Sequence, residues 1–187
     1  DSLAQMALAP SKDGTLSFYP DNYKKIYEYW MSNTIDWNIS RQIVWGIPIP
    51  AKLCTKCNWG GPDLENILTT CPLCDNPVIV DSDTFDTWFS SGQWPLLTLG
   101  FPDGQDFKTF YPTQLMETGR DLIFKWLPRM VIFGMYLAKK VPFKDIYLHG
   151  MVNDEENQKM SKSKGNVISP INICDEYGAD ALRMALV

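Results

Sequence analysis

The sequence predicts an α/β domain that carries a small metal-binding module. Between residues 113 and 152, a strand-like segment, a long apolar helical segment and a second strand-like segment follow one another. That order is typical of a βαβ unit with parallel strands and a right-handed crossover. Earlier in the chain, two CxxC pairs are separated by thirteen residues, a spacing typical of a structural zinc site.

Composition fits a globular chain with one sizeable core. The 187 residues are 45% hydrophobic and 21% charged, with a net charge of −5. The acidic balance leaves no basic footprint for nucleic acid, so any RNA contact must be local. Lys125 and Arg129 interrupt the most apolar run, Leu122 to Ala138, and residues 1–10 lack a signal-type start. We therefore expect a cytoplasmic protein without a membrane span.

The N-terminal part predicts one helix and one strand. Residues 11–20 carry turn formers and a break at Pro20, and Tyr23 to Met31 then places apolar side chains at helical spacing. The segment Asp36 to Pro50 begins like a strand and ends in two prolines that prevent regular pairing. We expect a short core-facing helix, then a strand that enters a rigid loop.

The four clustered cysteines, Cys54, Cys57, Cys71 and Cys74, are expected to bind zinc. Two knuckles of this kind can set four thiolates tetrahedrally around one ion and leave no open position for water, so the metal would be structural. Two disulfides or unbound thiols are the alternative, although nothing marks the chain for an oxidising compartment. Cys174 lies elsewhere in the sequence and is expected to be a small buried residue.

Residues 81–104 form an aromatic segment with frequent turn formers. Trp88 and Trp94 can be core anchors of an irregular segment. The aspartates Asp81, Asp83 and Asp86 could suggest a site for a hard metal ion, but turn and cap roles are the commoner use of such residues.

The predicted βαβ unit places polar groups where ligands bind. We expect strands at Thr113–Thr118 and Asp145–Val152, joined by a buried helix from Arg120 to Lys140 that is kinked at Pro128. Ligands in such sheets bind at the carboxyl ends of the strands. Those ends carry Gly119, Asp121, His149 and Gly150, and a carboxylate there can accept hydrogen bonds from ribose hydroxyls.

A lysine-rich loop follows the second strand. Lys159-Met160-Ser161-Lys162-Ser163 comes directly after an acidic turn and before Gly165. Lysines on long stems, together with hydroxyls and loop amides, suit a departing phosphate, although a solvated turn has the same composition. Ser169-Pro170 then predicts a helix start, Tyr177-Gly178 its end, and residues 179–186 a further helix.

The loop KMSKS and its flanks closely resemble the second signature of class I aminoacyl-tRNA synthetases. The resemblance implies the second half of a Rossmann nucleotide-binding fold with an inserted four-cysteine zinc ribbon or knuckle. Lys159 and Lys162 would stabilise the pyrophosphate leaving group of ATP bound with Mg²⁺. The implied contacts to ATP or adenylate are Gly119, Asp121, His149, Gly150, Met151, Val152, Met160, Ser161 and Ser163.

Two further strings point to one branch of that family. Asp-Thr-Trp-Phe-Ser-Ser at 86–91 and Thr-Gly-Arg-Asp-Leu-Ile-Phe-Lys-Trp at 118–126 resemble valyl-tRNA synthetases, and they imply an amino-acid pocket walled by Trp88, Leu122 and Trp126. Gly46 to Pro50 leans toward the isoleucyl pattern, so an isoleucine–tRNA ligase is the alternative. A non-catalytic, synthetase-derived zinc or RNA-binding module is a further one.

The resemblance implies a domain order. Residues 1–50 are the helix and strand that re-enter the catalytic domain, 51–80 the zinc module, and 81–187 the C-terminal half of the Rossmann domain. A His-Ile-Gly-His-type motif is absent from the sequence, so we expect the chain to be a fragment that is inactive alone. The full enzyme, a monomer, would join valine to tRNA(Val) through valyl-adenylate.

Overall fold

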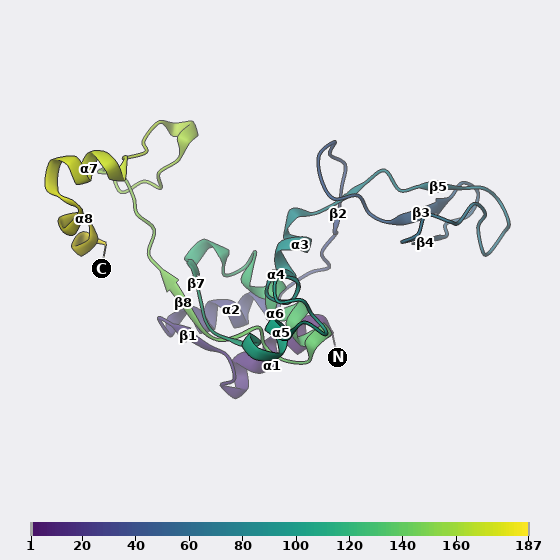
Figure 1. Ribbon diagram of the computed structural model, residues 1–187, viewed down its shortest axis with the longest axis horizontal. Coiled ribbons are helices and arrows are strands. Elements are labelled where there is room, and N and C mark those ends of the chain that lie inside the picture. Colours follow the sequence, from purple (N-terminus) through teal and green to yellow (C-terminus); the bar gives the residue numbers. More distant parts are fainter. Residues whose placement is uncertain (1, 187) are drawn as a thin grey trace. The chain divides into compact units, whose positions relative to one another are not determined.

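The computed structural model describes residues 2–186 and divides into two compact units, Asp1–Leu148 and His149–Val187 (Figure 1). The first unit contains the main core, the cysteine module and most of the secondary structure. The second unit contains the lysine-rich loop and two helices.

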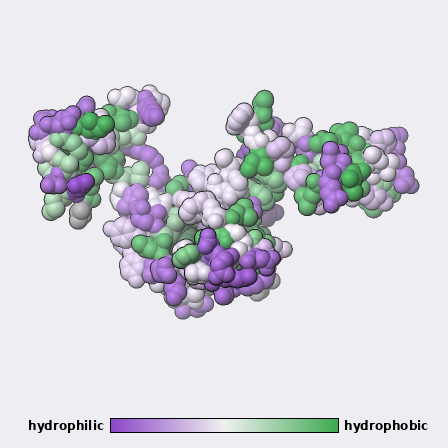
Figure 2. All heavy atoms as spheres, in the orientation of Figure 1, coloured by the Kyte–Doolittle hydropathy of each residue, from purple (hydrophilic) through white to green (hydrophobic). Residues whose placement is uncertain are grey.

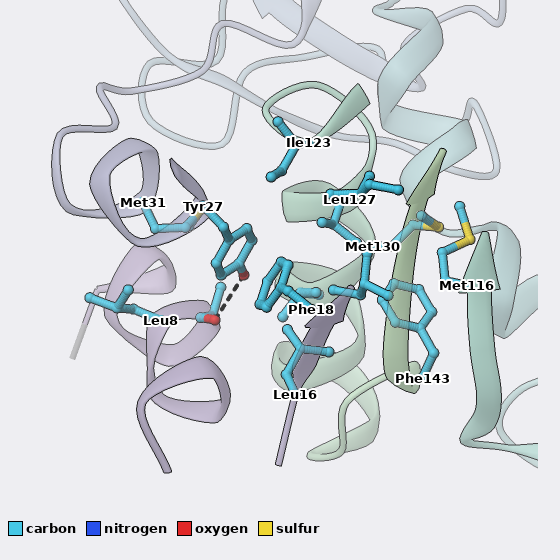
Figure 3. Close-up of a cluster of buried hydrophobic side chains, with 14 residues drawn as sticks. Leu8, Leu16, Phe18, Tyr27, Met31, Met116, Ile123, Leu127, Met130 and Phe143 are labelled. Atoms are coloured by element: carbon cyan, nitrogen blue, oxygen red, sulfur yellow. Dashed lines mark hydrogen bonds between the residues drawn. The ribbon is translucent and has the colours of Figure 1, made fainter. Parts of the chain in front are cut away.

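The main sheet has three strands, β1 (Ser17–Tyr19), β7 (Thr113–Gly119) and β8 (Phe143–His149), in the order β1-β8-β7. β1 pairs in parallel with β8, with Phe18 opposite Ile146, and the three strand arrows in Figure 3 point the same way. The predicted parallel sheet is therefore confirmed. β1 was missed, because its three residues lie inside a segment that reads as turns.

Two helices from the N-terminal part of the sequence precede and follow β1 and contribute side chains to the core. α1 (Leu3–Asp13) begins with a capping box in which the Ser2 hydroxyl accepts from the Gln5 amide and the Gln5 side chain accepts from the Ser2 amide. α2 (Asn22–Ser32) matches the predicted helix.

The core of the first unit gathers side chains from both helices, the sheet and the later helical segment. Tyr27 is fully buried, and its hydroxyl donates a 2.9 Å hydrogen bond to the carbonyl oxygen of Ala7, the dashed line in Figure 3. The ring of Phe18 lies 5.1 Å from that of Tyr27. The other labelled members are Leu8, Leu16, Met31, Met116, Ile123, Leu127, Met130 and Phe143.

The predicted helix from Arg120 to Lys140 is wrong as a single element. It consists of a 3-10 turn, η1 (Arg120–Leu122), the helix α6 (Leu127–Phe133) and a π-helical segment, η2 (Gly134–Ala138). Pro128 stands in the first turn of α6, where its missing N–H breaks no helical hydrogen bond, so it starts a helix instead of kinking one.

The cysteine module is built on a small antiparallel sheet. β3 (Ala51–Cys54) lies between β4 (Gly60–Pro62) and β5 (Val78–Val80). Outside it, β2 (Ser40–Arg41) pairs with β6 (Thr84–Phe85), so the strand expected in Asp36–Pro50 is reduced to two residues. This pairing joins the segment before the module to the segment after it.

Three short helices follow the module, and the first two lie within residues 81–104, where an irregular segment was expected. They are α3 (Thr87–Gly92), α4 (Trp94–Leu97) and α5 (Gln105–Phe110). α3 packs against α6 at Gly92, where an added Cβ would lie 2.9 Å from a ring carbon of Phe133 and 3.0 Å from the Cβ of Arg129. The absence of a side chain at Gly92 thus permits the close approach of the two helices.

The substitution Gly92→Ala is expected to lower the free energy of unfolding of the chain by about 1–3 kcal/mol, because the new methyl group overpacks the contact with α6. Urea denaturation measures the change. Gly150→Ala is the matched control, since nothing lies within 4 Å of its added Cβ, and it should change stability by no more than about 0.5 kcal/mol. Equal stability of Gly92→Ala and the unaltered chain would contradict the tight contact.

In the second unit, the predicted helices are confirmed as α7 (Pro170–Tyr177) and α8 (Ala179–Ala185). Neither helix buries a residue fully, and Figure 2 shows hydrophobic residues on the surface of this unit. Ile171, Tyr177 and Met184 are among the exposed apolar side chains. Among the described residues, no helix has both the length and the apolar character that a membrane crossing requires.

Candidate active site and metal centre

The four clustered cysteines meet at one point of the small sheet. Their Sγ atoms all lie within 4.8 Å of one another. Cys54 is 3.5 Å from Cys74, and Cys57 is 3.6 Å from both Cys71 and Cys74, measured between sulfur atoms. The two CxxC pairs therefore form one cluster, as the spacing predicts.

These distances fit a metal ion and do not fit disulfides. Four thiolates at about 2.3 Å from a tetrahedral zinc ion lie roughly 3.8 Å apart, whereas a disulfide joins its sulfurs at about 2.05 Å. The amides of Cys57 and Lys56 both donate to the sulfur of Cys54 at 3.3 Å, and these hydrogen bonds lower the pKa of Cys54 to about 6. The cluster could thus hold a metal ion with at least one thiol readily ionised.

An open pocket of about 320 Å³ lies beside α3 in the first unit. Trp88, Leu122 and Trp126, three residues far apart in sequence, line it together. The indole nitrogen of Trp126 donates a 2.9 Å hydrogen bond to the carbonyl oxygen of Ser91, which fixes the start of α6 against α3. The three predicted pocket residues are thus brought together in an apolar hollow.

Sequence reasoning missed two members of this pocket. Ser91 and Trp94 also line it. The sequence allows Trp94 as a core anchor, but in the structure Trp94 is 55% exposed, and its ring lies 6.4 Å from that of Trp126. The string that carries Trp88 contains Ser91 and stops three residues before Trp94, and an aromatic side chain in sequence does not reveal which way it faces.

The candidate nucleotide contacts lie at or just after the ends of β7 and β8, those after β7 in the first unit and those from His149 onward in the second. β7 ends at Gly119, and Asp121 follows in the 3-10 turn η1, partly buried. β8 ends at His149, so the strand predicted to run to Val152 stops three residues earlier. Gly150, Met151 and Val152 belong to the connection that leads into the lysine-rich loop.

The lysine-rich loop is braced by one aspartate and one asparagine. The Asn166 side chain donates a 2.6 Å hydrogen bond to the Asp154 carboxylate and accepts one of 2.9 Å from the Ser161 amide. The other oxygen of Asp154 accepts from the Gln158 amide at 2.7 Å. The acidic turn therefore holds the base of the loop.

The remaining contacts shape the loop itself. Ser161 caps the 3-10 turn η3 (Lys162–Lys164) by accepting from the Lys164 amide, and its hydroxyl lies 3.2 Å from that of Ser163. The sulfur of Met160 accepts from the Ile168 amide at 3.4 Å. Lys159 and Lys162 are both exposed, and Lys162 is the first residue of the turn η3.

The Asp154 carboxylate, which accepts hydrogen bonds from Asn166 and Gln158, is expected to titrate below the ordinary range of an aspartate. The hydrogen bond from Asn166, followed by that from the Gln158 amide, lowers the pKa of Asp154. Its contribution to loop order is therefore present above about pH 4, the ordinary pKa, and is lost as the pH falls through the lower folded-state pKa. Nuclear magnetic resonance titration of Asp154 measures its pKa, and the signal of the Asn166 side-chain amide reports how the order of the loop depends on pH.

The variant Asn166→Ala is the control for this titration. Loss of the side-chain donor should return the midpoint of Asp154 toward its ordinary value, about 3.9. An unaltered chain whose Asp154 titrates at or above that value would contradict the brace.

Comparison with known proteins places the chain in a family. A family model described as tRNA synthetases class I (I, L, M and V) matches residues 1–58 and 74–187. The chain belongs to the class I tRNA synthetases. The unmatched residues, 59–73, lie within the cysteine module, between β3 and β5.

Similar class I synthetases include proteins named valine–tRNA ligase. The chain is 46% identical to that of Solibacter usitatus over 192 residues and 47% identical to that of Thermus thermophilus over 191 residues. Each alignment covers 99% of this chain and 22% of the relative. The chain thus spans about a fifth of the length of the curated relatives it matches.

Solved structures of class I synthetases are similar as well. The leucyl-tRNA synthetase of Agrobacterium radiobacter K84, in a ternary complex with tRNA and LeuAMS, superposes with a TM-score of 0.66 at 28% identity. That match covers 82% of this chain and 24% of the other. The Mycobacterium tuberculosis methionyl-tRNA synthetase bound by methionyl-adenylate superposes with a TM-score of 0.66 over 98% of this chain and 31% of its own, and at 21% identity it supports the fold.

Proposed function

We propose that the chain is the part of a valine–tRNA ligase that holds valine and the phosphate-facing lysines. The reaction joins valine and ATP to valyl-adenylate and pyrophosphate, then transfers valine to tRNA(Val). The observation that carries the proposal is the pocket of Trp88, Leu122 and Trp126, found in a class I synthetase whose similar relatives are named valine–tRNA ligases.

The pocket chemistry supports a small branched apolar side chain. Its lining is dominated by indole rings and one leucine, with no charged side chain among the lining residues. Burial of apolar surface is worth about 25 cal/mol per Å², so a hollow of this kind favours valine over polar amino acids. One methylene is worth only about 1–3 kcal/mol, which makes isoleucine the competitor that any test must include.

The lysine-rich loop supports stabilisation of the leaving group. The substrate carboxylate is already ionised at neutral pH, so its attack on the α-phosphorus needs no general base. Positioning and charge neutralisation remain, and Lys159 and Lys162 are the groups we assign to the departing pyrophosphate of Mg²⁺-bound ATP. Met160, Ser161 and Ser163 belong to the same loop and would contact the phosphates.

The remaining roles concern adenosine. We assign ribose contacts to Gly119 and Asp121, because a carboxylate at the end of a parallel strand can accept from ribose hydroxyls. His149, Gly150, Met151 and Val152, at and after the end of β8, are assigned to the adenine base. The intact protein is proposed to act on tRNA(Val) as a cytoplasmic monomer.

We assign the cysteine cluster to Zn²⁺. Four sulfurs at this spacing would saturate the ion, so the metal would supply folding of the module and no chemistry at the pocket. Residues 51–80 would then be the zinc module, with the re-entering segment 1–50 before it and the nucleotide half 81–187 after it.

A hybrid enzyme tests the proposal. In it, this chain replaces the matching segment of the Thermus thermophilus relative, which supplies the parts that the chain does not span. The hybrid should catalyse ATP–pyrophosphate exchange with valine and more weakly with isoleucine. A folded hybrid that prefers isoleucine, or that exchanges pyrophosphate with neither amino acid, would contradict the proposed function.

A further inference from the structure

The Asp86 carboxylate is a buried junction between two segments far apart in the sequence. Its side chain is 7% exposed. One oxygen accepts a 2.9 Å hydrogen bond from the Trp88 amide and so caps α3. The other oxygen accepts from the Trp37 indole at 3.0 Å and pairs with the Arg41 guanidinium. Asp86 therefore fastens the start of α3 to the segment that precedes the cysteine module.

Arg129, on α6, adds a positive charge beside the junction of Asp86, Trp37 and Arg41. The guanidinium of Arg129, on α6, lies over the Trp37 ring with 4.3 Å to its centroid. Burial raises the pKa of Asp86, but the hydrogen bonds from Trp88 and Trp37 and the charges of Arg41 and Arg129 outweigh it and hold that pKa below its usual range. The carboxylate is thus charged, buried and surrounded by donors, an arrangement that fixes its position closely.

Beyond its first turn, α3 is held by the aromatic contacts of Phe89 and by a hydrogen bond to the carbonyl oxygen of Ser91. Phe89 stacks on Phe85 at 4.4 Å between centroids and meets Phe133 edge-on at 5.4 Å. Ser91 is tied to Trp126. These contacts fix the middle and end of the helix, so the orientation of Trp88 in its first turn depends on the junction at Asp86.

We propose that Asp86, anchored by Trp37 and Arg41, is the positioning residue that sets Trp88 in the wall of the amino-acid pocket. This proposal rests on the proposed function for the identity of the ligand. The contacts of Asp86 with Trp88, Trp37 and Arg41 do not depend on that function. Asp86 lines no part of the pocket and acts through Trp88, whose amide it binds two residues along the chain.

A plain helix cap is the competing role, and the contacts separate the two. A cap needs only the hydrogen bond to the Trp88 amide, which Trp37→Phe and Arg41→Met both leave in place. Positioning also needs the second oxygen of the Asp86 carboxylate, which is bound by Trp37 and Arg41. Trp37→Phe removes the indole donor and keeps a ring for Arg129 to cover, whereas Arg41→Met removes the cation and keeps the length of the side chain.

Nuclear magnetic resonance of the full chain tests the geometry without any ligand. The indole N–H signal of Trp88, assigned with Trp88→Phe, should shift in Trp37→Phe and in Arg41→Met. Arg183→Met is the matched control, since Arg183 pairs with Asp180 at 3.4 Å where both side chains are exposed. An unmoved Trp88 signal in both junction variants would overturn the positioning role.

Calorimetry with a non-hydrolysable valyl-adenylate analogue tests the consequence. Each junction variant should raise the dissociation constant about tenfold, the effect of losing one charge-assisted hydrogen bond, with the binding stoichiometry unchanged. A merely structural role predicts a lower stoichiometry with the same dissociation constant, and that result would overturn the proposal. An unaltered chain that prefers the isoleucyl analogue would count against the proposed function while the Trp88 shifts still decide the role of Asp86.

Discussion

Removal of the zinc ion that we assign to the cysteine cluster is expected to unfold residues 51–80 and to leave the main core folded. The module buries little besides Cys71, and its three short strands cannot supply a core of their own. In structural zinc sites of this size, metal binding contributes roughly 10–16 kcal/mol to the free energy of folding. Cys71→Ser, which deletes the fully buried ligand, should therefore lower the zinc content from one ion per chain toward none and expose the remaining thiols.

Metal analysis and thiol titration, with and without a chelator, measure this effect. Cys174→Ser is the matched control, because that cysteine lies outside the cluster and should leave the zinc content at one. A chain purified without bound metal whose module amides remain protected from exchange would contradict a folding role for the ion.

Lys162→Ala is expected to slow adenylate formation by about 10²- to 10³-fold in the hybrid enzyme, because the variant loses the charged donor that we assign to the departing pyrophosphate. The lysine stands in the turn η3, which Ser161 and the Asp154–Asn166 brace hold in place. Single-turnover pyrophosphate release measures the rate. The KM for valine should stay within about twofold, since a leaving-group interaction contributes to the transition state and not to ground-state binding of the amino acid.

Lys164→Ala provides the matched control for this prediction. Lys164 belongs to the same exposed turn but has no assigned contact with ATP, so its loss should slow the reaction by less than about tenfold through charge alone. Equal effects of the two substitutions would show that the loop acts only as a diffuse positive patch.

Short-range patterns predicted much of the fold. The helix around Tyr27 and the strand at Thr113 follow from the spacing of their residues, and the helix after Ser169 follows from a proline at its first position. The cysteine cluster also followed from spacing, because two CxxC pairs on hairpins have few other arrangements. β1 was missed, since its three residues become a strand only by pairing with β8.

The long apolar run after Gly119 shows a second limit. Its composition indicates a buried helix, but the chain turns at Arg120–Leu122 before α6 begins at Leu127. A proline in the first turn and a proline in mid-helix look alike in sequence, and the structure separates them by starting α6 at Leu127, one residue before Pro128.

The candidate site was predicted where a motif carried it and missed where tertiary contacts create it. Trp88, Leu122 and Trp126 came from strings that resemble a known family, and the structure places them around one pocket. The contacts of Asp86 with Trp37 and Arg41 were not predicted from any motif. Trp37 and Arg41 lie far before it in the sequence, so their meeting depends on the β2–β6 pairing.

The pocket beside α3 and the carboxylate of Asp121, both in the first unit, are proposed to bind the amino acid and the ribose of valyl-adenylate with a preference for valine. Calorimetric titration of the chain with non-hydrolysable valyl- and isoleucyl-adenylate analogues, beside the variants Lys162→Ala and Asp121→Ala, measures that selectivity. We expect tighter binding of the valyl analogue and weaker binding in Asp121→Ala, which loses the carboxylate assigned to the ribose. Tighter binding of the isoleucyl analogue, or equal binding by Asp121→Ala and the unaltered chain, would contradict the assignment.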